Sequence, residues 1–416
     1  MSSMQSRATA ALALGVALLS LVAATGAQTL SVLYTFTGKD GDNGLGALVR
    51  DSAGNLYGTS FDGGDNGAGT VVKLSKEQNG VWKETVLYTF QGSGDGAFPL
   101  GRLVLDSEGN LYGITSGLAG TLFKLTPSGE KTELYTFCSL ANCADGASPN
   151  GGLVRDADGN LYGTTALGGL AGECCGTAFK VTKVGKETVL YNFCSLANCA
   201  DGSFPVGGGE FFPDERLVRD AAGNLYGTTP NGGVSAFCKD DRGCGTVFEV
   251  DKTGKETVLY SFCSEAKCAD GLYPTVGLTE DAAGNLYGTT LVGGAHVHYG
   301  TVFEVNAAGK ETVLYSFPGK VDIGEVQPSS LAIDAAGNLY GTTEASGKFN
   351  AGSVFRLTNA GGLGTLYSFH DGTDGGGPMG GLILDPAGNL YGTTGLGGDP
   401  SGCNGIGCGT AFELTP

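Results

Sequence analysis

Short apolar runs alternate with glycine-rich breaks along almost the whole chain. Between residues 277 and 317, four such runs follow one another, with the sequences GLTED, NLYGTT, GTVFEV and ETVLYSF. The first two are joined by Ala-Ala-Gly and the last two by Asn-Ala-Ala-Gly-Lys, short turns in which glycine can supply a positive φ. Runs rich in Thr, Val, Tyr and Phe favour strands over helices. The pattern therefore predicts four short antiparallel strands in this segment.

This four-strand unit is repeated. The ten residues DAAGNLYGTT start at Asp220, at Asp281 and at Asp334 without any change. Close variants are DSAGNLYGTS from Asp51, DSEGNLYGIT from Asp106, DADGNLYGTT from Asp156 and DPAGNLYGTT from Asp385. Successive copies are 50 to 64 residues apart. Four antiparallel strands in a repeat of this length are typical of a β-propeller blade, whereas a β-helix coil is shorter and a helical repeat shows a period of 3.6.

The faces of the strands and the ends of the chain support the same fold. In VLYSF at 313–317, Val, Tyr and Phe share one face and Leu lies on the other, as expected for a blade buried between two neighbours. VLYTF at 32–36 is a fourth-type strand without a blade before it, and GTAFEL at 409–414 is a third-type strand without a fourth after it. We therefore predict an all-β, seven-bladed propeller formed as one domain by residues 28–416. Residues 30–36 should close the ring by covering the edge of the last blade.

The recurring segments also resemble a known family. GNLYGTT, GG, GTVFE and KETVLYSF are similar to the GloVer tandem repeat of exported bacterial proteins. The resemblance covers nearly all of the chain after its first residues. It implies export and a propeller-like fold, and it carries no catalytic residues to this sequence.

The N-terminal residues predict a targeting signal. Arg7 and an apolar run at 10–24 precede Thr25-Gly26-Ala27, whose small residues suit cleavage after Ala27. We interpret residues 1–27 as a signal peptide; the alternative is an uncleaved membrane anchor. The formal net charge of −18 argues against nucleic acid and anionic membranes as partners. We expect a monomer, secreted or at the cell surface or in the periplasm, that is not inserted in a membrane and meets an unidentified extracellular ligand or protein.

The cysteines fit an exported protein. There are twelve, and they fall into close pairs along the chain. The pairs are Cys138–Cys143, Cys174–Cys175, Cys194–Cys199, Cys238–Cys244, Cys263–Cys268 and Cys403–Cys408. An even number in an exported chain indicates disulfides, and we predict one local bridge for each pair. Zinc is the alternative, but the spacing is mostly C-x4-C in separate repeats rather than in paired zinc knuckles.

The cysteines also divide the predicted ring into two faces. All of them lie in the loops between second and third strands or in the connections between blades, which together form the cysteine-bearing face. The opposite, short-turn face carries the two short turns of each blade. Variable loops on a rigid scaffold usually carry function, so we expect ligand or partner contacts on the cysteine-bearing face. The fourth repeat departs most from the others, through Phe211, Phe212, Phe237, Asp240, Asp241 and Arg242. These residues predict an aromatic and charged contact patch, the alternative being loops that pack on themselves.

Two other features could bind a metal ion. His296 and His298, beside Tyr299, are alternate residues of one loop and could form a metal or acid–base site, or could simply be exposed. Asp-Gly pairs at 95–96, 145–146, 201–202 and 270–271, and KDGDNG at 39–44, offer oxygen ligands for calcium. Their recurrence favours a turn in which Asp caps the backbone. We expect no cofactor, with calcium as the alternative.

No hydrolase elbow, phosphate loop or dinucleotide motif occurs in the sequence. The expected function is therefore that of an exported, non-enzymatic binding module. The alternatives are a propeller lyase or lactonase acting on a carbohydrate or lactone, and a structural component of the cell surface or matrix. An enzyme would need titratable groups that converge at the mouth of the channel.

Overall fold

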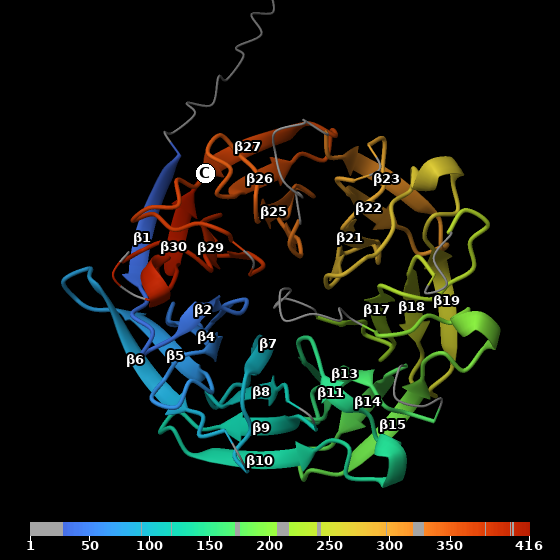
Figure 1. Cartoon of the computed structure of the whole chain (residues 1–416), viewed down its shortest axis with the longest axis horizontal. Coiled ribbons are helices and arrows are strands. Elements are labelled where there is room, and N and C mark those ends of the chain that lie inside the picture. Colours follow the sequence, from blue (N-terminus) through green and yellow to red (C-terminus); the bar gives the residue numbers. More distant parts are fainter. Residues whose placement is uncertain are drawn as a thin grey trace, which may run out of the picture.

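The computed structural model shows a ring of seven antiparallel sheets around a central channel (Figure 1). It describes residues 28–92, 94–117, 119–170, 175–205, 216–238, 243–296, 298–318, 328–378, 380–399, 401 and 403–416. Each sheet contains four strands, arranged in order from the channel to the perimeter. The sheets of blades 1 and 3 contain a fifth strand. The prediction of a seven-bladed propeller is confirmed. The predicted signal peptide lies outside the described residues.

The strands fall into four concentric sets. The innermost are β3 (Val49–Arg50), β7 (Pro99–Leu105), β12 (Val154–Arg155), β16 (Val218–Arg219), β20 (Thr279–Glu280), β24 (Ala332–Ile333) and β28 (Ile383–Leu384). The second set is β4 (Leu56–Asp62), β8 (Leu111–Thr115), β13 (Leu161–Leu167), β17 (Leu225–Thr229), β21 (Leu286–Thr290), β25 (Leu339–Thr343) and β29 (Leu390–Thr393). The third set is β5 (Thr70–Lys76), β9 (Thr121–Leu125), β14 (Thr177–Val181), β18 (Thr246–Val250), β22 (Thr301–Val305), β26 (Ser353–Leu357) and β30 (Thr410–Thr415).

The outermost set runs around the perimeter of the ring. It consists of β6 (Trp82–Thr89), β10 (Lys131–Thr136), β15 (Glu187–Asn192), β19 (Glu256–Ser261), β23 (Glu311–Ser316), β27 (Leu363–Ser368) and β1 (Thr29–Thr35). The additional strands β2 (Asp42–Leu45) and β11 (Ala147–Pro149) extend the sheets of blades 1 and 3. Four short 3-10 turns complete the described elements: η1 (Ala141–Cys143), η2 (Ala197–Cys199), η3 (Ala266–Cys268) and η4 (Cys403–Gly405).

The ring closes as predicted. Strand β1 lies antiparallel against β30, with Thr29 opposite Thr415 and Thr35 opposite Thr410 (Figure 1). The N-terminal strand therefore supplies the outer strand of the last blade. This pairing covers the edge of β30, which would otherwise present unpaired backbone groups to solvent.

The repeated decapeptide forms a hydrogen-bonded turn between the first and second strands. The Asp220 carboxylate accepts hydrogen bonds from the Asn224 amide N–H at 2.8 Å, the Asn224 side chain at 2.9 Å and the Tyr226 hydroxyl at 3.2 Å. The same three donors recur in the other six blades. The letters Asp, Asn and Tyr repeat because one carboxylate organises each turn.

The hydrophobic core lies in the seams between blades. At one seam Phe262, which follows the outer strand of blade 4, meets Phe303 of blade 5 edge to face, with ring centroids 5.0 Å apart. Equivalent phenylalanine pairs lie at five further seams. In six of the seven blades the glycine of LYG leaves room for such a ring; a Cβ added to Gly227, for example, would lie only 2.6 Å from Phe248. Seam packing thus accounts for the apolar character of both blade faces.

Candidate functional site

In the Asp-Gly connections the aspartate accepts hydrogen bonds from its own turn. Asp145 is fully buried, and its carboxylate accepts hydrogen bonds from the Tyr135 hydroxyl at 2.7 Å and from the Ser139 and Leu140 amides at 2.8 and 3.1 Å. Asp201 and Asp270 have the same set of donors. Each of these carboxylates therefore caps the backbone of its own turn, as their recurrence led us to expect.

The calcium-like stretch at 39–44 begins with the same kind of turn. Asp40 accepts hydrogen bonds from the Tyr34 hydroxyl at 2.5 Å and from the Thr37 amide at 2.8 Å. This carboxylate thus caps its turn in the same way.

Five of the six predicted disulfides are present. They are Cys138–Cys143, Cys194–Cys199, Cys238–Cys244, Cys263–Cys268 and Cys403–Cys408. In the sixth pair, Cys174 lies outside the described residues and Cys175 is buried.

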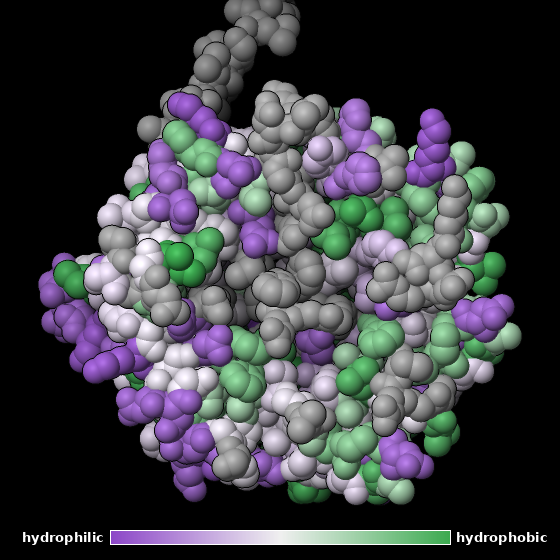
Figure 2. Space-filling view, viewed as in Figure 1, coloured by the Kyte–Doolittle hydropathy of each residue, from purple (hydrophilic) through white to green (hydrophobic). Residues whose placement is uncertain are grey.

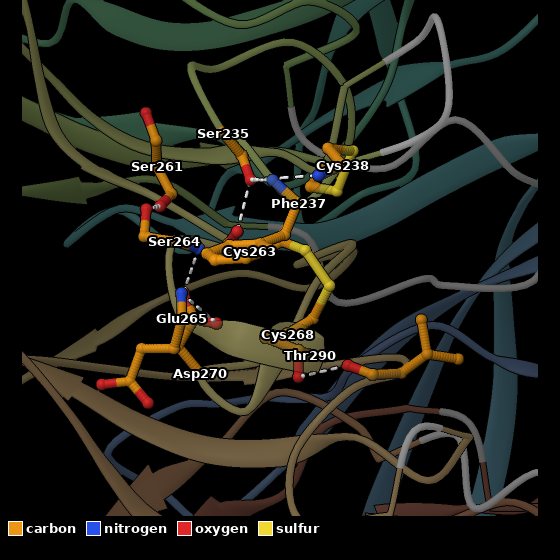
Figure 3. Close-up of a disulfide and its surroundings, with 12 residues drawn as sticks. Ser235, Phe237, Cys238, Ser261, Cys263, Ser264, Glu265, Cys268, Asp270 and Thr290 are labelled. Atoms are coloured by element: carbon orange, nitrogen blue, oxygen red, sulfur yellow. Dashed lines mark hydrogen bonds between the residues drawn. A yellow bond between two sulfur atoms is a disulfide. The ribbon is translucent and has the colours of Figure 1, made fainter.

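Two of these bridges lie next to each other where blade 4 meets the connection to blade 5 (Figure 3). The Sγ atoms of Cys244, Cys263 and Cys268 are all within 4.8 Å of one another. Because each of these sulfur atoms is already in a disulfide, none is a thiolate that could bind zinc.

The predicted contact patch is only partly described. Phe237 is 44% exposed, and its amide donates to Ser235 Oγ at 3.1 Å beside the Cys238–Cys244 bridge (Figure 3). Phe211, Phe212, Asp240, Asp241 and Arg242 lie outside the described residues. The patch therefore stays a prediction.

The histidine loop of blade 5 stays a prediction as well. His296 and His298 are exposed, and Tyr299 is half-buried against the core between blades 5 and 6. The Tyr299 amide donates to the His296 carbonyl at 3.2 Å, which shapes the loop. His370, on another connection, lies 2.9 Å from the Asp374 carboxylate.

The central channel contains a cationic cluster that we did not predict. A hollow of about 640 Å³ is lined by residues of the innermost strands of blades 1 to 5. Its charged lining residues are Arg50, Arg102, Arg155, Arg216, Arg219 and Glu280. Five of the eight arginines in the sequence thus gather here, although the chain has a net charge of −18.

Three of these arginines occupy the same position in their repeats, directly before the Asp of the decapeptide. The guanidinium carbon of Arg219 lies 5.1 Å from the centroid of the Tyr162 ring in the preceding blade. Arg155 and Arg50 stack in the same way on tyrosines of the blades before them, at 5.6 and 6.0 Å. A Cβ added to Gly223 would lie 3.0 Å from Arg219 Nη2, so the guanidinium also rests on its own turn. Cation–π contacts and this packing hold the three cations near the short-turn end of the channel.

The other two arginines reach across the channel. Arg216 of blade 4 donates from Nη2 to the Leu331 carbonyl of blade 6 at 2.9 Å. Arg102 of blade 2 donates from Nη2 to the Leu382 carbonyl of blade 7 at 3.5 Å. These side chains join blades that are not neighbours, so they hold the width of the channel and place their charge inside it. Glu280 is the acidic member of the described lining, and its pKa is raised by burial and by the nearby carboxylates of Asp220 and Asp281.

Two further hollows lie outside the channel. A groove of about 660 Å³ lies at the short turns of blade 3, around Asp158 and Lys183. A smaller hollow of about 320 Å³ lies on the cysteine-bearing face of blade 7, between Asp371 and Ile406. In Figure 2, hydrophobic residues form small separate groups, and hydrophilic ones gather at the exposed β5–β6 turn, residues 76–80.

The fold and the disulfides define a disulfide-bonded, seven-bladed β-propeller with an arginine-lined channel. The chain belongs to the Gloeobacter/Verrucomicrobia repeat family, whose model matches residues 18–210 and 212–416. The resemblance seen in the repeated segments is thereby confirmed.

Solved structures share the fold at low identity. Virginiamycin B lyase from Staphylococcus aureus is 14% identical, with a TM-score of 0.59 over 94% of this chain and 99% of that one. The WD40 propeller domain of Doa1 is 15% identical, with a TM-score of 0.55 over 93% and 97%. PorZ, a surface component of the type-IX secretion system of Porphyromonas gingivalis, is 15% identical, with a TM-score of 0.51 over 92% and 48%. No curated protein matches significantly. No helix within the described residues has the length and apolar character needed to cross a membrane.

Proposed function

We propose that this protein is an exported binding module whose channel takes a small anionic ligand. The observation that carries the proposal is the convergence of five arginines on one hollow in a strongly acidic chain. Guanidinium groups bind carboxylates and phosphates through paired, charge-assisted hydrogen bonds. Arginines this close repel one another, and an anion between them relieves that repulsion. The protein's own long-range field repels anions, so selectivity must come from this local cluster.

The channel has the size and chemistry of a small-molecule site. Its volume of about 640 Å³ is within the range of ligand pockets, and Val, Leu and Thr lie between its charged residues. The buried Nε atoms of Arg50, Arg155, Arg216 and Arg219 make no hydrogen bond within the described part of the chain. A ligand with a carboxylate and several hydroxyls, such as a sugar acid, would use the arginines for its charge and Glu280 as a hydroxyl acceptor.

The proposed location rests on two features. The first 27 residues have the pattern of a signal peptide, and five disulfides are typical of proteins that fold in oxidising compartments.

A lyase is the second candidate, because Glu280, a carboxyl group with a raised pKa, stands in the channel beside the arginines. General acid–base catalysis needs a titratable group poised near neutral pH. Glu280 is a single such acid among the described lining residues, and the other charged residues there are the five arginines. This composition favours binding over turnover.

Calorimetry with a ligand panel tests the proposal. Galacturonate, citrate and phosphate represent the anions, and galactose is the neutral comparator. The triple variant R50Q/R155Q/R219Q should lose at least about tenfold in affinity, since one charged hydrogen bond contributes roughly 1.5–3 kcal/mol. R356Q is the matched control, because Arg356 also stacks on a tyrosine, Tyr340 at 5.9 Å, yet does not line the channel. Equal binding by the triple variant, or no preference for anions over galactose, would refute the proposal.

A further inference from the structure

One position in the outer strand carries a different charge in different blades. Glu84, Glu187, Glu256 and Glu311 each pair with the last buried apolar residue of the neighbouring third strand, in blades 1, 3, 4 and 5. Lys131 occupies the same register position in blade 2, opposite Leu125. The structure therefore compares acidic and basic versions of one site within a single chain.

In blade 2 this site holds a buried cation. The Lys131 side chain is 7% exposed, and its ammonium donates to Asp95 Oδ1 at 2.8 Å and to the Asp95 backbone carbonyl at 2.5 Å. The ammonium also lies over the rings of Tyr88 and Phe90, at 5.7 and 5.6 Å. Asp95 belongs to the Asp-Gly turn that enters from blade 1. An Asp carboxylate, its own carbonyl and two aromatic faces thus surround a positive charge at the seam.

In blades 1, 3, 4 and 5 a glutamate carboxyl group occupies the position that the Lys131 ammonium has in blade 2. The Oε1 atom of each Glu is buried and has no hydrogen-bond partner within the described residues. Glu311 lies within electrostatic range of Asp270 and Tyr260, the counterparts of Asp95 and Tyr88. Glu84, Glu187 and Glu256 lie within electrostatic range of Asp40, Asp145 and Asp201. Two carboxyl groups therefore share each seam where blade 2 has a carboxylate and an ammonium.

We propose that each of these four Glu–Asp pairs binds a calcium ion at the position that the Lys131 ammonium occupies in blade 2. Glu Oε1, Asp Oδ1 and the Asp backbone carbonyl would supply oxygen ligands, and water would complete the shell. Calcium takes six to eight oxygens in irregular geometry, whereas magnesium demands a regular octahedron. Two carboxylates balance the charge of the ion. Burial and the neighbouring Asp raise the pKa of Glu84, Glu187 and Glu256 to about 7. Without a cation, the ionised form of each glutamate is therefore unfavourable at its site.

The arrangement also predicts the stoichiometry. Blade 2 carries its own cation, and the equivalent position holds Leu363 in blade 6 and Leu30 in blade 7. In the seam of blade 7, Asp374 is instead paired with His370. The chain should therefore bind four calcium ions. Each would join the outer strand of one blade to the turn that enters from the blade before it.

Thermal unfolding and calorimetry of the full chain test the proposal. After chelator treatment at pH 8, 10 mM CaCl₂ should raise the Tm by at least about 5 °C, while MgCl₂ and matched NaCl should do much less. The quadruple variant E84Q/E187Q/E256Q/E311Q should lose this shift. The matched control E77Q/E108Q/E130Q/E133Q removes four exposed glutamates and should keep it. Calorimetry should give a stoichiometry near four for the native chain.

The remaining outcomes are equally decisive. An absent calcium shift, or one that persists in the quadruple variant, overturns the proposal. So does stabilisation by acidification to pH 6 without any effect of calcium, because each pair would then share a proton instead of a metal ion. If the quadruple variant does not fold, E311K supplies the blade 2 ammonium to blade 5 and should bind three ions. A count unchanged by E311K also overturns the proposal.

Discussion

Glu311 should make the metal-free protein less stable in alkaline solution. Burial, together with Asp270 and Glu265, raises its pKa from 4.5 to about 8. A carboxyl with a raised pKa binds its proton more tightly in the folded state. Its contribution to stability is therefore complete below about pH 4.5 and is lost as the pH rises through about 8. The aspartates of the decapeptide turns have lowered pKa values, so they titrate in more acidic solution and leave this window undisturbed.

The magnitude follows from the same shift. At full strength, a rise from 4.5 to about 8 corresponds to about 5 kcal/mol. The side chain is only partly buried, and solvent screening reduces this to roughly 1–2 kcal/mol. E311Q cannot take the negative charge, so it should match the native chain at pH 4.5 and exceed it by that amount at pH 9. Urea unfolding in EDTA at both pH values measures the difference.

The exposed Glu77 provides the control, since E77Q should not alter the pH dependence of unfolding. The prediction fails if the stability of the native chain is flat between pH 4.5 and 9, or if the E311Q variant loses as much stability as the native chain over this range. Either result would show that ionisation of Glu311 does not destabilise the folded protein. The inferred two-carboxyl seam would then be wrong.

Three further predictions concern the fold. Deleting residues 28–36 should lower the Tm by more than about 10 °C and promote aggregation in light scattering, because it exposes the edge of β30 and the seam that buries Phe36. Gly227→Ala should cost about 2–4 kcal/mol in urea unfolding, since its Cβ would overlap Phe248, whereas Gly80→Ala at an open turn should cost less. Reduction should make the cysteine-bearing loops sensitive to protease while the strand signal in circular dichroism persists, because each bridge observed spans only five or six residues. Collapse of that signal on reduction would contradict this view.

The sequence was sufficient to predict the architecture because the repeated segments identify the strands and turns of each blade directly. Each decapeptide marks one turn between a first and a second strand. The unpaired strand-like segments at the two ends of the chain indicate that β1 and β30 pair to close the ring. The disulfides were also predictable, since each partner lies in the same loop. Short-range patterns of this kind can be recognised in the sequence because the residues that interact are close together in the chain.

The channel could not be predicted in the same way. Arg50, Arg155 and Arg219 share the sequence Val-Arg-Asp, but this short motif does not predict that their side chains line the same hollow. Arg102 and Arg216 share an Arg-Leu-Val signal four residues before the Asp of the decapeptide, but their partners lie 280 and 115 residues away in the chain. In the sequence, these positions look like ordinary strand residues. Convergence across a ring is a property of the closed fold.

Repetition itself indicates where function can arise. The turn built by Asp, Asn and Tyr, and the glycine that admits a phenylalanine ring, are the same in nearly every blade because each blade must pack in the same way. Packing alone gives no reason why one register position of the outer strand is Glu in four blades, Lys in blade 2 and Leu in blades 6 and 7. Nor does it explain why the residue before the decapeptide is Arg in three blades and Glu in a fourth. In a repeat protein the equivalent blades serve as internal controls, so an ionic departure from the repeat identifies a position with a task besides packing. By that criterion the channel and the outer seams are the places to test first.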